Sequence, residues 1–184
     1  MMTEGEATLA DGKTRIAEQV RVRFEDRLVS PIFERDGEVL LSIENYAPFL
    51  LNAVSSSWQR ISGARYRDEF GLGITDWRVI AMLAIEPGIS AQRITEVVKL
   101  DKSAVSRALK SLTASGHVAG HEIGSGARNK TWQLTEFGME THRRILSIAL
   151  SNELALVDGI PLADLEICQR VLRQMLGNLA GLEA

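Results

Sequence analysis

Residues 90–134 constrain the fold more than any other part of the sequence. They contain two short amphipathic helical patterns separated by a tight turn, followed by two extended stretches that are separated by glycine-rich residues. The first helix starts at the cap Ser90, and the second runs over residues 102–115. The extended stretches, 117–123 and 130–134, are typical of a β-hairpin. This order of elements predicts a winged helix-turn-helix.

The helix at residues 102–115 has one apolar face and one polar face. Its inner positions are Ala104, Val105, Ala108, Leu109 and Leu112, and its outer positions are Lys102, Ser103, Ser106, Arg107 and Lys110. Cations on the outer face suit phosphates, and short hydroxyls let the backbone approach a groove. The Arg107 guanidinium can donate two hydrogen bonds to one guanine, at O6 and N7. We therefore expect this face to read the major groove.

The distribution of charge supports a nucleic-acid partner although the chain is acidic as a whole. The formal net charge is −3, but residues 99–130 hold six basic and two acidic side chains, which gives +4 there and −7 elsewhere. Counterion release rewards only the cations that reach phosphates, so a local basic segment is sufficient. A solvated basic face, or a face for an acidic protein partner, remains the alternative.

The predicted contacts to double-stranded DNA come from both helices and from the hairpin. Arg128 and Lys130 flank a tip containing Gly124 and Gly126, where a cation could reach the minor groove. The full set of predicted contacts is Ser90, Gln92, Lys102, Ser103, Ser106, Arg107, Lys110, Arg128 and Lys130.

Long helical patterns flank the central segment, so the expected fold class is mainly α with a small β-hairpin wing. We expect an N-terminal extension over 1–44 with one helix, in which Ile16, Val20, Phe24 and Leu28 recur at helical spacing. The main domain spans 45–184, with the winged helix-turn-helix at 75–134 and helix starts at the caps Thr75 and Thr135. Long apolar stripes at 45–70 and 135–184 require a partner, and we assign them to dimerisation.

Several stretches of the chain resemble the multiple antibiotic resistance regulator (MarR) family of winged-helix transcription factors. The most specific is Leu-Asp-Lys-Ser-Ala-Val-Ser-Arg-Ala-Leu-Lys-Ser-Leu at 100–112, followed by Gly116. The run Leu-Gly-Ile-Thr-Asp-Trp at 72–77 and the pair Leu-Thr at 134–135 also resemble the family. The resemblance implies a homodimer, two recognition helices in successive major grooves, and a small-molecule pocket between the dimerisation and DNA-binding parts.

Aromatic and cationic side chains lie near the place where this resemblance implies an effector pocket. The candidates are Trp58, Arg60, Arg65, Tyr66, Trp77, Arg78, His142 and Arg143. Arginine and aromatic groups together suit an aromatic acid or its coenzyme A thioester. Each of these side chains also has a structural interpretation as core or surface. The expected function is a ligand-responsive repressor on a pseudo-palindromic operator.

The remaining reactive residues have structural interpretations. Cys168 has apolar neighbours at helical spacing, Leu165 and Val171, so we expect a buried core thiol, and a redox-sensing regulator is the alternative. His117 and His121 are four residues apart on a predicted strand, about 13 Å, too far to share a zinc ion. We interpret both as surface histidines and expect no metal.

No catalytic signature is present, so we expect neither an enzyme nor a cofactor. The single cysteine excludes an intramolecular disulfide. The acidic N-terminus is unlike a signal peptide, and the longest uncharged stretch is too short for a bilayer. We therefore expect a cytoplasmic protein without membrane contact.

Overall fold

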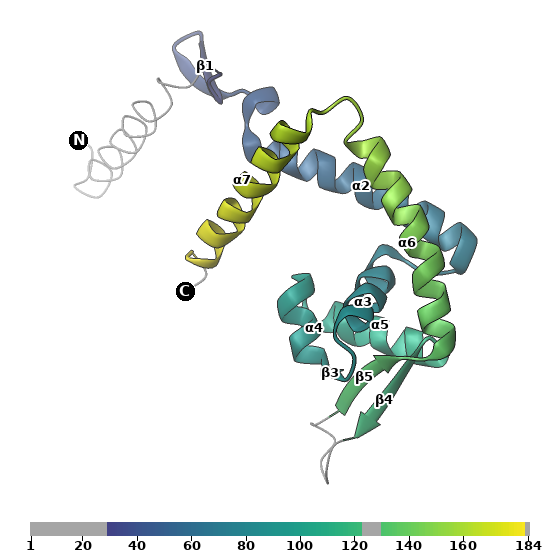
Figure 1. The fold of residues 1–184 in the computed structure, drawn as a ribbon. Coiled ribbons are helices and arrows are strands. Elements are labelled where there is room, and N and C mark those ends of the chain that lie inside the picture. The colour runs from purple at the N-terminus through teal and green to yellow at the C-terminus, as the bar shows by residue number, and fades with distance from the viewer. Residues whose placement is uncertain (1–28, 123–129, 183–184) are drawn as a thin grey trace, which may run out of the picture. The chain divides into compact units, whose positions relative to one another are not determined.

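A computed structural model describes residues 29–122 and 130–182. The chain forms two compact units, Met1–Arg60 and Ile61–Ala184, and the division falls inside the long helix α2 (Ala47–Phe70). Helices dominate the described residues (Figure 1). The fold class expected from the sequence, mainly α with a small β-hairpin wing, is confirmed.

The first unit contains a β-hairpin that the sequence analysis did not predict. Strands β1 (Ile32–Arg35) and β2 (Glu38–Leu41) pair in antiparallel register, and Asp36 and Gly37 between them have φ angles of 56° and 79°. Positive φ at both central residues is the two-residue turn that matches the twist of paired strands, and Asp-Gly is its usual sequence. The 3₁₀ turn η1 (Ile43–Asn45) follows. The helix predicted for the extension lies outside the described residues, apart from its last residues.

The second unit carries the elements predicted for residues 75–134 and the two long helices after them. In chain order they are α3 (Ile74–Ile85), β3 (Ile89–Ser90), α4 (Ala91–Val98), α5 (Lys102–Ala114), β4 (Val118–Glu122), β5 (Lys130–Leu134), α6 (Glu136–Leu156) and α7 (Leu162–Ala180). Two short helices, a tight turn and a hairpin make the winged helix-turn-helix. The structure therefore confirms this prediction.

Two of the three predicted helix caps are confirmed. The Ser90 hydroxyl accepts a hydrogen bond from the backbone N–H of Arg93 at 3.2 Å, and the Thr135 hydroxyl accepts one from Gly138 at 3.0 Å. The prediction of Thr75 as a cap is wrong, because α3 begins one residue earlier. Its cap is Gly73, whose N–H donates to the carboxylate of Asp76 at 2.8 Å.

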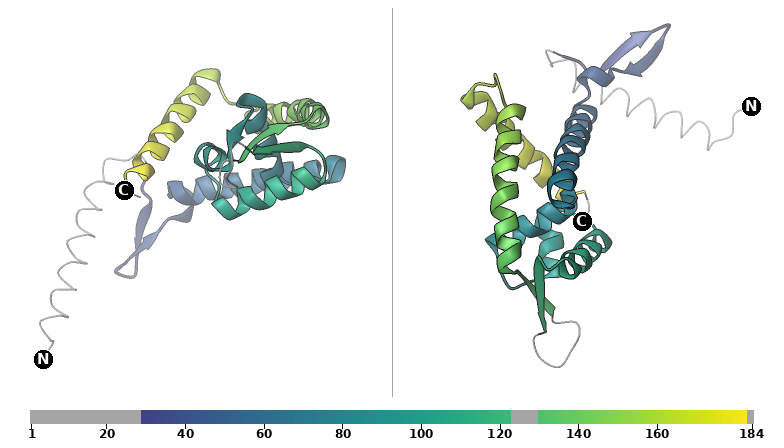
Figure 2. Two further views of the ribbon diagram at one scale, coloured as in Figure 1. Left: turned by 90° about the horizontal axis from the view of Figure 1, so that it is seen from below. Right: turned by 90° about the vertical axis from the view of Figure 1, so that its right-hand side faces the viewer.

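The wing is part of a three-stranded antiparallel sheet with the order β3, β5, β4 (Figure 1). Figure 2 shows the two longer strands, β4 and β5, from two further sides. Val118 pairs with Leu134 at one end of the β4–β5 ladder, and Ser90 pairs with Thr131 on the other side of β5. Strand β3 was not predicted because it is only two residues long. It joins the start of the helix-turn-helix directly to the wing.

One hydrophobic core holds the second unit together. The inner face of α5 supplies Val105, Ala108, Leu109 and Leu112, each at most 4% exposed. They pack with buried residues of α3, α4, β4 and α6: Val79, Ile80, Met82, Leu83, Ile94, Val118 and Ile145. Burying one face of α5 leaves the opposite face in solvent, as the sequence predicts.

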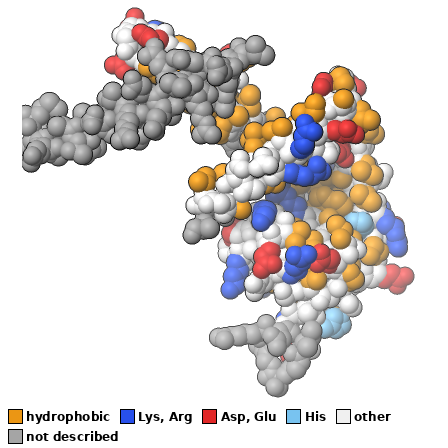
Figure 3. All heavy atoms as spheres, turned by 60° about the vertical axis from the view of Figure 1, so that its left-hand side comes forward, with side chains coloured by type: hydrophobic (Ala, Val, Ile, Leu, Met, Phe, Trp, Pro, Cys, Tyr) orange, Lys and Arg blue, Asp and Glu red, His pale blue; other side chains and the backbone are white. Residues whose placement is uncertain are grey.

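The last two helices expose much of their apolar surface. Helix α7 contains no buried residue, and Leu150, Leu154 and Leu176 are 52%, 71% and 58% exposed. On the face drawn in Figure 3, hydrophobic side chains reach the surface between those of Lys and Arg. The prediction that Cys168 is a buried core thiol is wrong for this chain, because the residue is exposed on α7. No helix of the described residues is long and apolar enough to span a bilayer.

Candidate nucleic-acid interface

A short turn sets the start of α5. Lys99 ends α4 in the left-handed region with a φ angle of 53°, and Asp101 caps α5 two residues later. The Asp101 carboxylate accepts a hydrogen bond from the backbone N–H of Ala104 at 2.8 Å. This cap gives a hydrogen-bond partner to a backbone N–H in the first turn that would otherwise have none, so α5 begins at a defined residue.

The outer face of α5 presents all five side chains predicted for it. Lys102, Ser103, Ser106, Arg107 and Lys110 are all exposed. They lie on one surface because the residues between them form the core. The result is a helix face with three cations and two hydroxyls.

Arg107 is held by its own helix. Its Nη1 donates to the hydroxyl oxygen of Ser103 at 3.1 Å, and the Ser103 hydroxyl in turn donates to the Asp101 carboxylate. The hydrogen bonds from Ser103 and Ala104, followed by the charge of Arg107, lower the pKa of Asp101. The carboxylate is therefore ionised at neutral pH, and it forms the end of a chain of three side chains.

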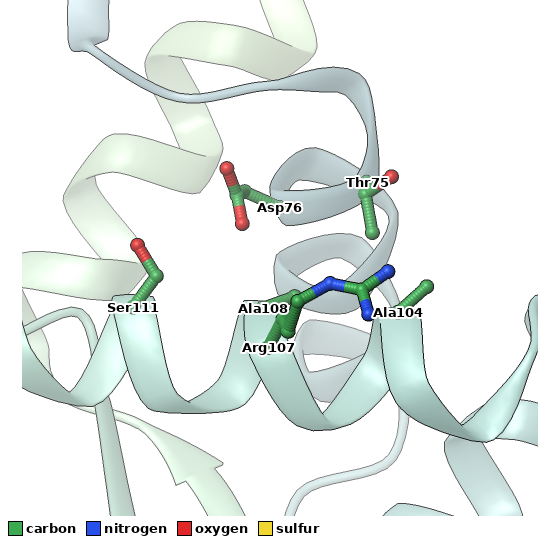
Figure 4. A pocket seen from close by; sticks show the side chains of 6 residues that line it. All are labelled: Thr75, Asp76, Ala104, Arg107, Ala108 and Ser111. Atoms are coloured by element: carbon green, nitrogen blue, oxygen red, sulfur yellow. The ribbon is translucent and has the colours of Figure 1, made fainter.

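A small cavity of about 250 Å³ lies between α5 and the start of α3. It is lined by Thr75, Asp76, Ala104, Arg107, Ala108 and Ser111. Figure 4 shows the Arg107 side chain running along α5 toward Ala104, with its guanidinium on the side of Thr75. The arginine that we expect to read DNA thus lies beside the first turn of α3, and its side chain is exposed.

A larger groove of about 500 Å³ lies between α5 and β5. Lys102, Lys110 and Lys130 line it together with Trp132, which the sequence analysis did not single out. The Lys130 ammonium lies 4.6 Å from the centroid of the Trp132 ring, within cation–π range. Among the residues that the structure describes, no acidic side chain lines the groove. Three lysines from two elements therefore meet on one surface suited to phosphate.

Of the other predicted DNA contacts, two already make hydrogen bonds within the protein and one is not described. Ser90 caps α4, and its hydroxyl is engaged by the backbone. Gln92 is exposed, but its amide donates to the Glu96 carboxylate at 3.0 Å. Arg128 lies outside the described residues.

The predicted effector residues form a smaller cluster than expected. Trp77 stacks on His142 with ring centroids 5.4 Å apart, and its ring lies 6.0 Å from that of Tyr66. The His142 Nδ1 is buried and has no hydrogen-bond partner. Burial, followed by the charge of Arg143, lowers the pKa of His142, and burial raises the pKa of Tyr66.

The arginines predicted to bind the effector are more widely separated than the aromatic residues. Arg65 donates to the side chains of Glu69 and Asn152, Arg143 pairs with Glu140 at 2.9 Å, and Arg78 is half-buried. Trp58 and Arg60 belong to the first unit. Within the second unit, the structure therefore brings together Tyr66, Trp77 and His142, with Arg143 next in sequence.

The prediction of two surface histidines is wrong for His117. This residue is 5% exposed, its Nδ1 lies 2.8 Å from the Ser115 hydroxyl, and its ring packs on Phe137 at 4.5 Å. Burial lowers the pKa of His117, and Asp76 opposes the shift. Among the described residues, no three His, Cys, Asp or Glu side chains gather where they could hold a metal ion.

The comparisons with known proteins agree with this geometry. The MarR family model matches residues 70–128, which include α3, α4, α5 and β4. Over residues 70–128 the chain is therefore similar to the MarR family. No curated protein matches the sequence.

Solved structures of transcriptional regulators resemble a larger part of the chain. A MarR/EmrR family transcriptional regulator from Acinetobacter sp. ADP1 is 26% identical with a TM-score of 0.71, over 77% of this chain and 99% of that one. The transcriptional regulator PA3341 is 26% identical with a TM-score of 0.66, over 74% and 99%. The PcaV transcriptional regulator from Streptomyces coelicolor, solved in complex with its natural ligand, is 15% identical with a TM-score of 0.67, over 75% and 96%. At that identity the likeness to PcaV concerns the fold alone.

Proposed function

We propose that this protein is a homodimeric, ligand-responsive repressor that occupies a pseudo-palindromic DNA operator in the cytoplasm and has no enzymatic activity. The observation that carries the proposal is the exposed outer face of α5, where Lys102, Arg107 and Lys110 stand beside two hydroxyls. A helix of this kind in a winged helix-turn-helix enters the major groove. Lys130 and the groove beside Trp132 add contacts to the backbone of the duplex.

The homodimer is supported by the apolar surface of the last two helices. Leu146, Leu150 and Leu154 are spaced by four residues on α6 and become more exposed along the helix, from 37% to 71%. Helix α7 buries none of its apolar side chains. Large contiguous apolar surfaces on a folded chain mark association sites. A second copy of the chain supplies matching surface with two-fold symmetry.

The effector is proposed to be a small aromatic acid or its coenzyme A thioester. Trp77 and His142 offer stacked rings, Arg143 offers a cation, and the orphaned Nδ1 of His142 is a polar group that a ligand could satisfy. The solved PcaV–ligand complex has the same fold, which supports a ligand site in this scaffold. Release of DNA by the effector completes the proposed switch.

The test is selection of duplexes from a random-sequence pool by the full chain, followed by binding to the selected duplex and to a random duplex of equal length. We expect tight binding to the selected duplex, looser binding to the random one, and a steep loss of affinity with salt. Binding to an acidic polypeptide but to neither duplex would overturn the proposal in favour of a protein partner. Addition of benzoate or benzoyl-coenzyme A should then release the selected duplex.

A further inference from the structure

The most specific arrangement on the outer face of α5 is the chain of hydrogen bonds from Arg107 through Ser103 to Asp101. We infer that Ser103 and Asp101 are positioning residues that hold the Arg107 guanidinium in its DNA-reading pose, and that Ser103 does not itself contact a base. This inference rests on the proposed function and adds a specificity device to it. It also changes the role of Ser103 from the contact that the sequence suggested.

The hydroxyl of Ser103 makes two hydrogen bonds within the helix. Its one proton goes to the Asp101 carboxylate, and one of its lone pairs accepts the proton on Arg107 Nη1. To donate to a base or a phosphate, Ser103 would have to give up an ionised acceptor. Hydrogen bonds to charged groups are the stronger ones, so this exchange is unfavourable.

Asp101 is fixed by a second, independent bond. Its carboxylate accepts the backbone N–H of Ala104 at 2.8 Å, which ties it to the first turn of α5. The anchor of the chain is therefore part of the helix frame and does not depend on a mobile side chain. A carboxylate placed directly against phosphates would repel them, but the positive charge of Arg107 partly offsets the charge of Asp101.

Arg107 keeps the donors that base reading needs. One Nη1 proton is used by Ser103, and within the described residues this guanidinium makes no other hydrogen bond. The side chain also lies along the cavity that Thr75 and Ala104 line (Figure 4). A free arginine loses much rotamer freedom when it docks, whereas a tethered one has already lost it. Tethering therefore favours the one base pair that fits the held pose.

Ser106 provides a matched comparison on the same face. It is exposed like Ser103 and one turn further along α5, but in the described part of the chain it makes no side-chain hydrogen bond. If Ser103 acts by positioning Arg107, removing its hydroxyl should weaken DNA binding only while Arg107 is present. If Ser106 contacts DNA directly, removing its hydroxyl should weaken binding equally with and without Arg107.

The experiment is a double-mutant cycle measured on the selected duplex, with Ser103→Ala, Arg107→Ala and the double variant. We expect Ser103→Ala to weaken binding by about three- to tenfold and to broaden the preference at a single base pair, as loss of one hydrogen bond would. In the Arg107→Ala background the same change should cost less than a factor of two. Ser103→Thr, which keeps the hydroxyl, should restore both affinity and preference.

Two further variants separate positioning from helix stability. Asp101→Ser keeps a favoured cap residue but shortens the side chain, so it should reproduce the loss of preference without lowering the melting temperature. Ser106→Ala should have the same effect with and without Arg107. An unchanged cost of Ser103→Ala in the Arg107→Ala background would overturn the inference and restore Ser103 as a direct contact. Failure of the wild-type chain to bind any duplex would instead overturn the proposed function.

Discussion

The carbonyl oxygen of His117 lies directly over the Cα of Gly138, where a Cβ would come within 2.0 Å of it. The same carbonyl accepts a hydrogen bond from the backbone N–H of Thr135, so it cannot turn away without loss. Gly138 therefore allows the turn between α5 and β4 and the start of α6 to approach closely. We expect Gly138→Ala to lower the free energy of unfolding by about 1–3 kcal/mol, measured by urea denaturation at fixed protein concentration.

Gly177→Ala is the matched control, because both glycines are inside helices. A Cβ at Gly177 meets nothing within 4 Å, and alanine is the better helix former by about 1 kcal/mol. This variant should be as stable as the wild type or more stable. Equal destabilisation by both substitutions would contradict the role assigned to the carbonyl of His117.

Stability should fall on mild acidification because of two histidines. Burial lowers the pKa of His117 and of His142, so the unfolded chain takes up protons at a higher pH than the folded chain. The free energy of unfolding should therefore decrease as the pH falls below about 6.5, the unfolded value, and level off below the two folded pKa values.

The pH series should stop at pH 5. The carboxyls of Glu86 and Asp101 have lowered pKa values, so the stability that they contribute is lost only at more acidic pH. His142→Gln should make the urea midpoint less dependent on pH between 8 and 5. A midpoint that rises on acidification in this window would show that the histidines are not held neutral by burial.

Arg107 and Lys110 should differ in what they contribute to DNA binding. Arg107→Ala should cost about 1–3 kcal/mol on the selected duplex and relax the preference at one base pair. Lys110→Ala should weaken binding to selected and random duplexes alike and reduce the salt slope by about one. Fluorescence anisotropy across a salt series distinguishes the two. An equal loss on both duplexes for Arg107→Ala would make it a phosphate contact.

The exposed apolar surface of α7 predicts the oligomeric state. Light scattering at micromolar concentration should give about twice 20.3 kDa. Leu176→Glu places a charge on a side chain that is 58% exposed in the single chain, and it should shift the mass toward the monomer. Gln174→Glu on the same helix should remain a dimer. A wild-type monomer that binds the selected duplex tightly would exclude the dimer.

The sequence predicted those features of the structure that depend on residues close together in the chain. The caps Ser90 and Thr135 and both faces of α5 were predicted correctly, because helical spacing and side-chain capping are local. The cap Thr75 was wrong because Asp76 reaches back to Gly73, and a glycine cap carries no side-chain signal. The hairpin around Asp36-Gly37 was not predicted, although Asp-Gly between two apolar stretches is a hairpin signal.

Contacts between distant elements explain the remaining differences. His117 is buried because Phe137, twenty residues later, packs on its ring, and Trp132 joins the candidate interface because β5 lies beside α5. Cys168 has apolar neighbours along α7, but nothing in the described chain covers them. Helical spacing shows which residues share a face, and only the tertiary arrangement determines whether that face is covered.

Ser90 has two structural roles that leave no spacer between the wing sheet and the helix-turn-helix. It pairs with Thr131 in the sheet, and its hydroxyl caps α4, which begins at the next residue. One residue inserted between Ser90 and Ala91 would turn α4 by about 100° relative to the sheet or break the cap. The five-residue connection between α6 and α7, residues 157–161, can absorb such an insertion. Homologous chains should therefore vary in length at the second place and keep a fixed length at the first.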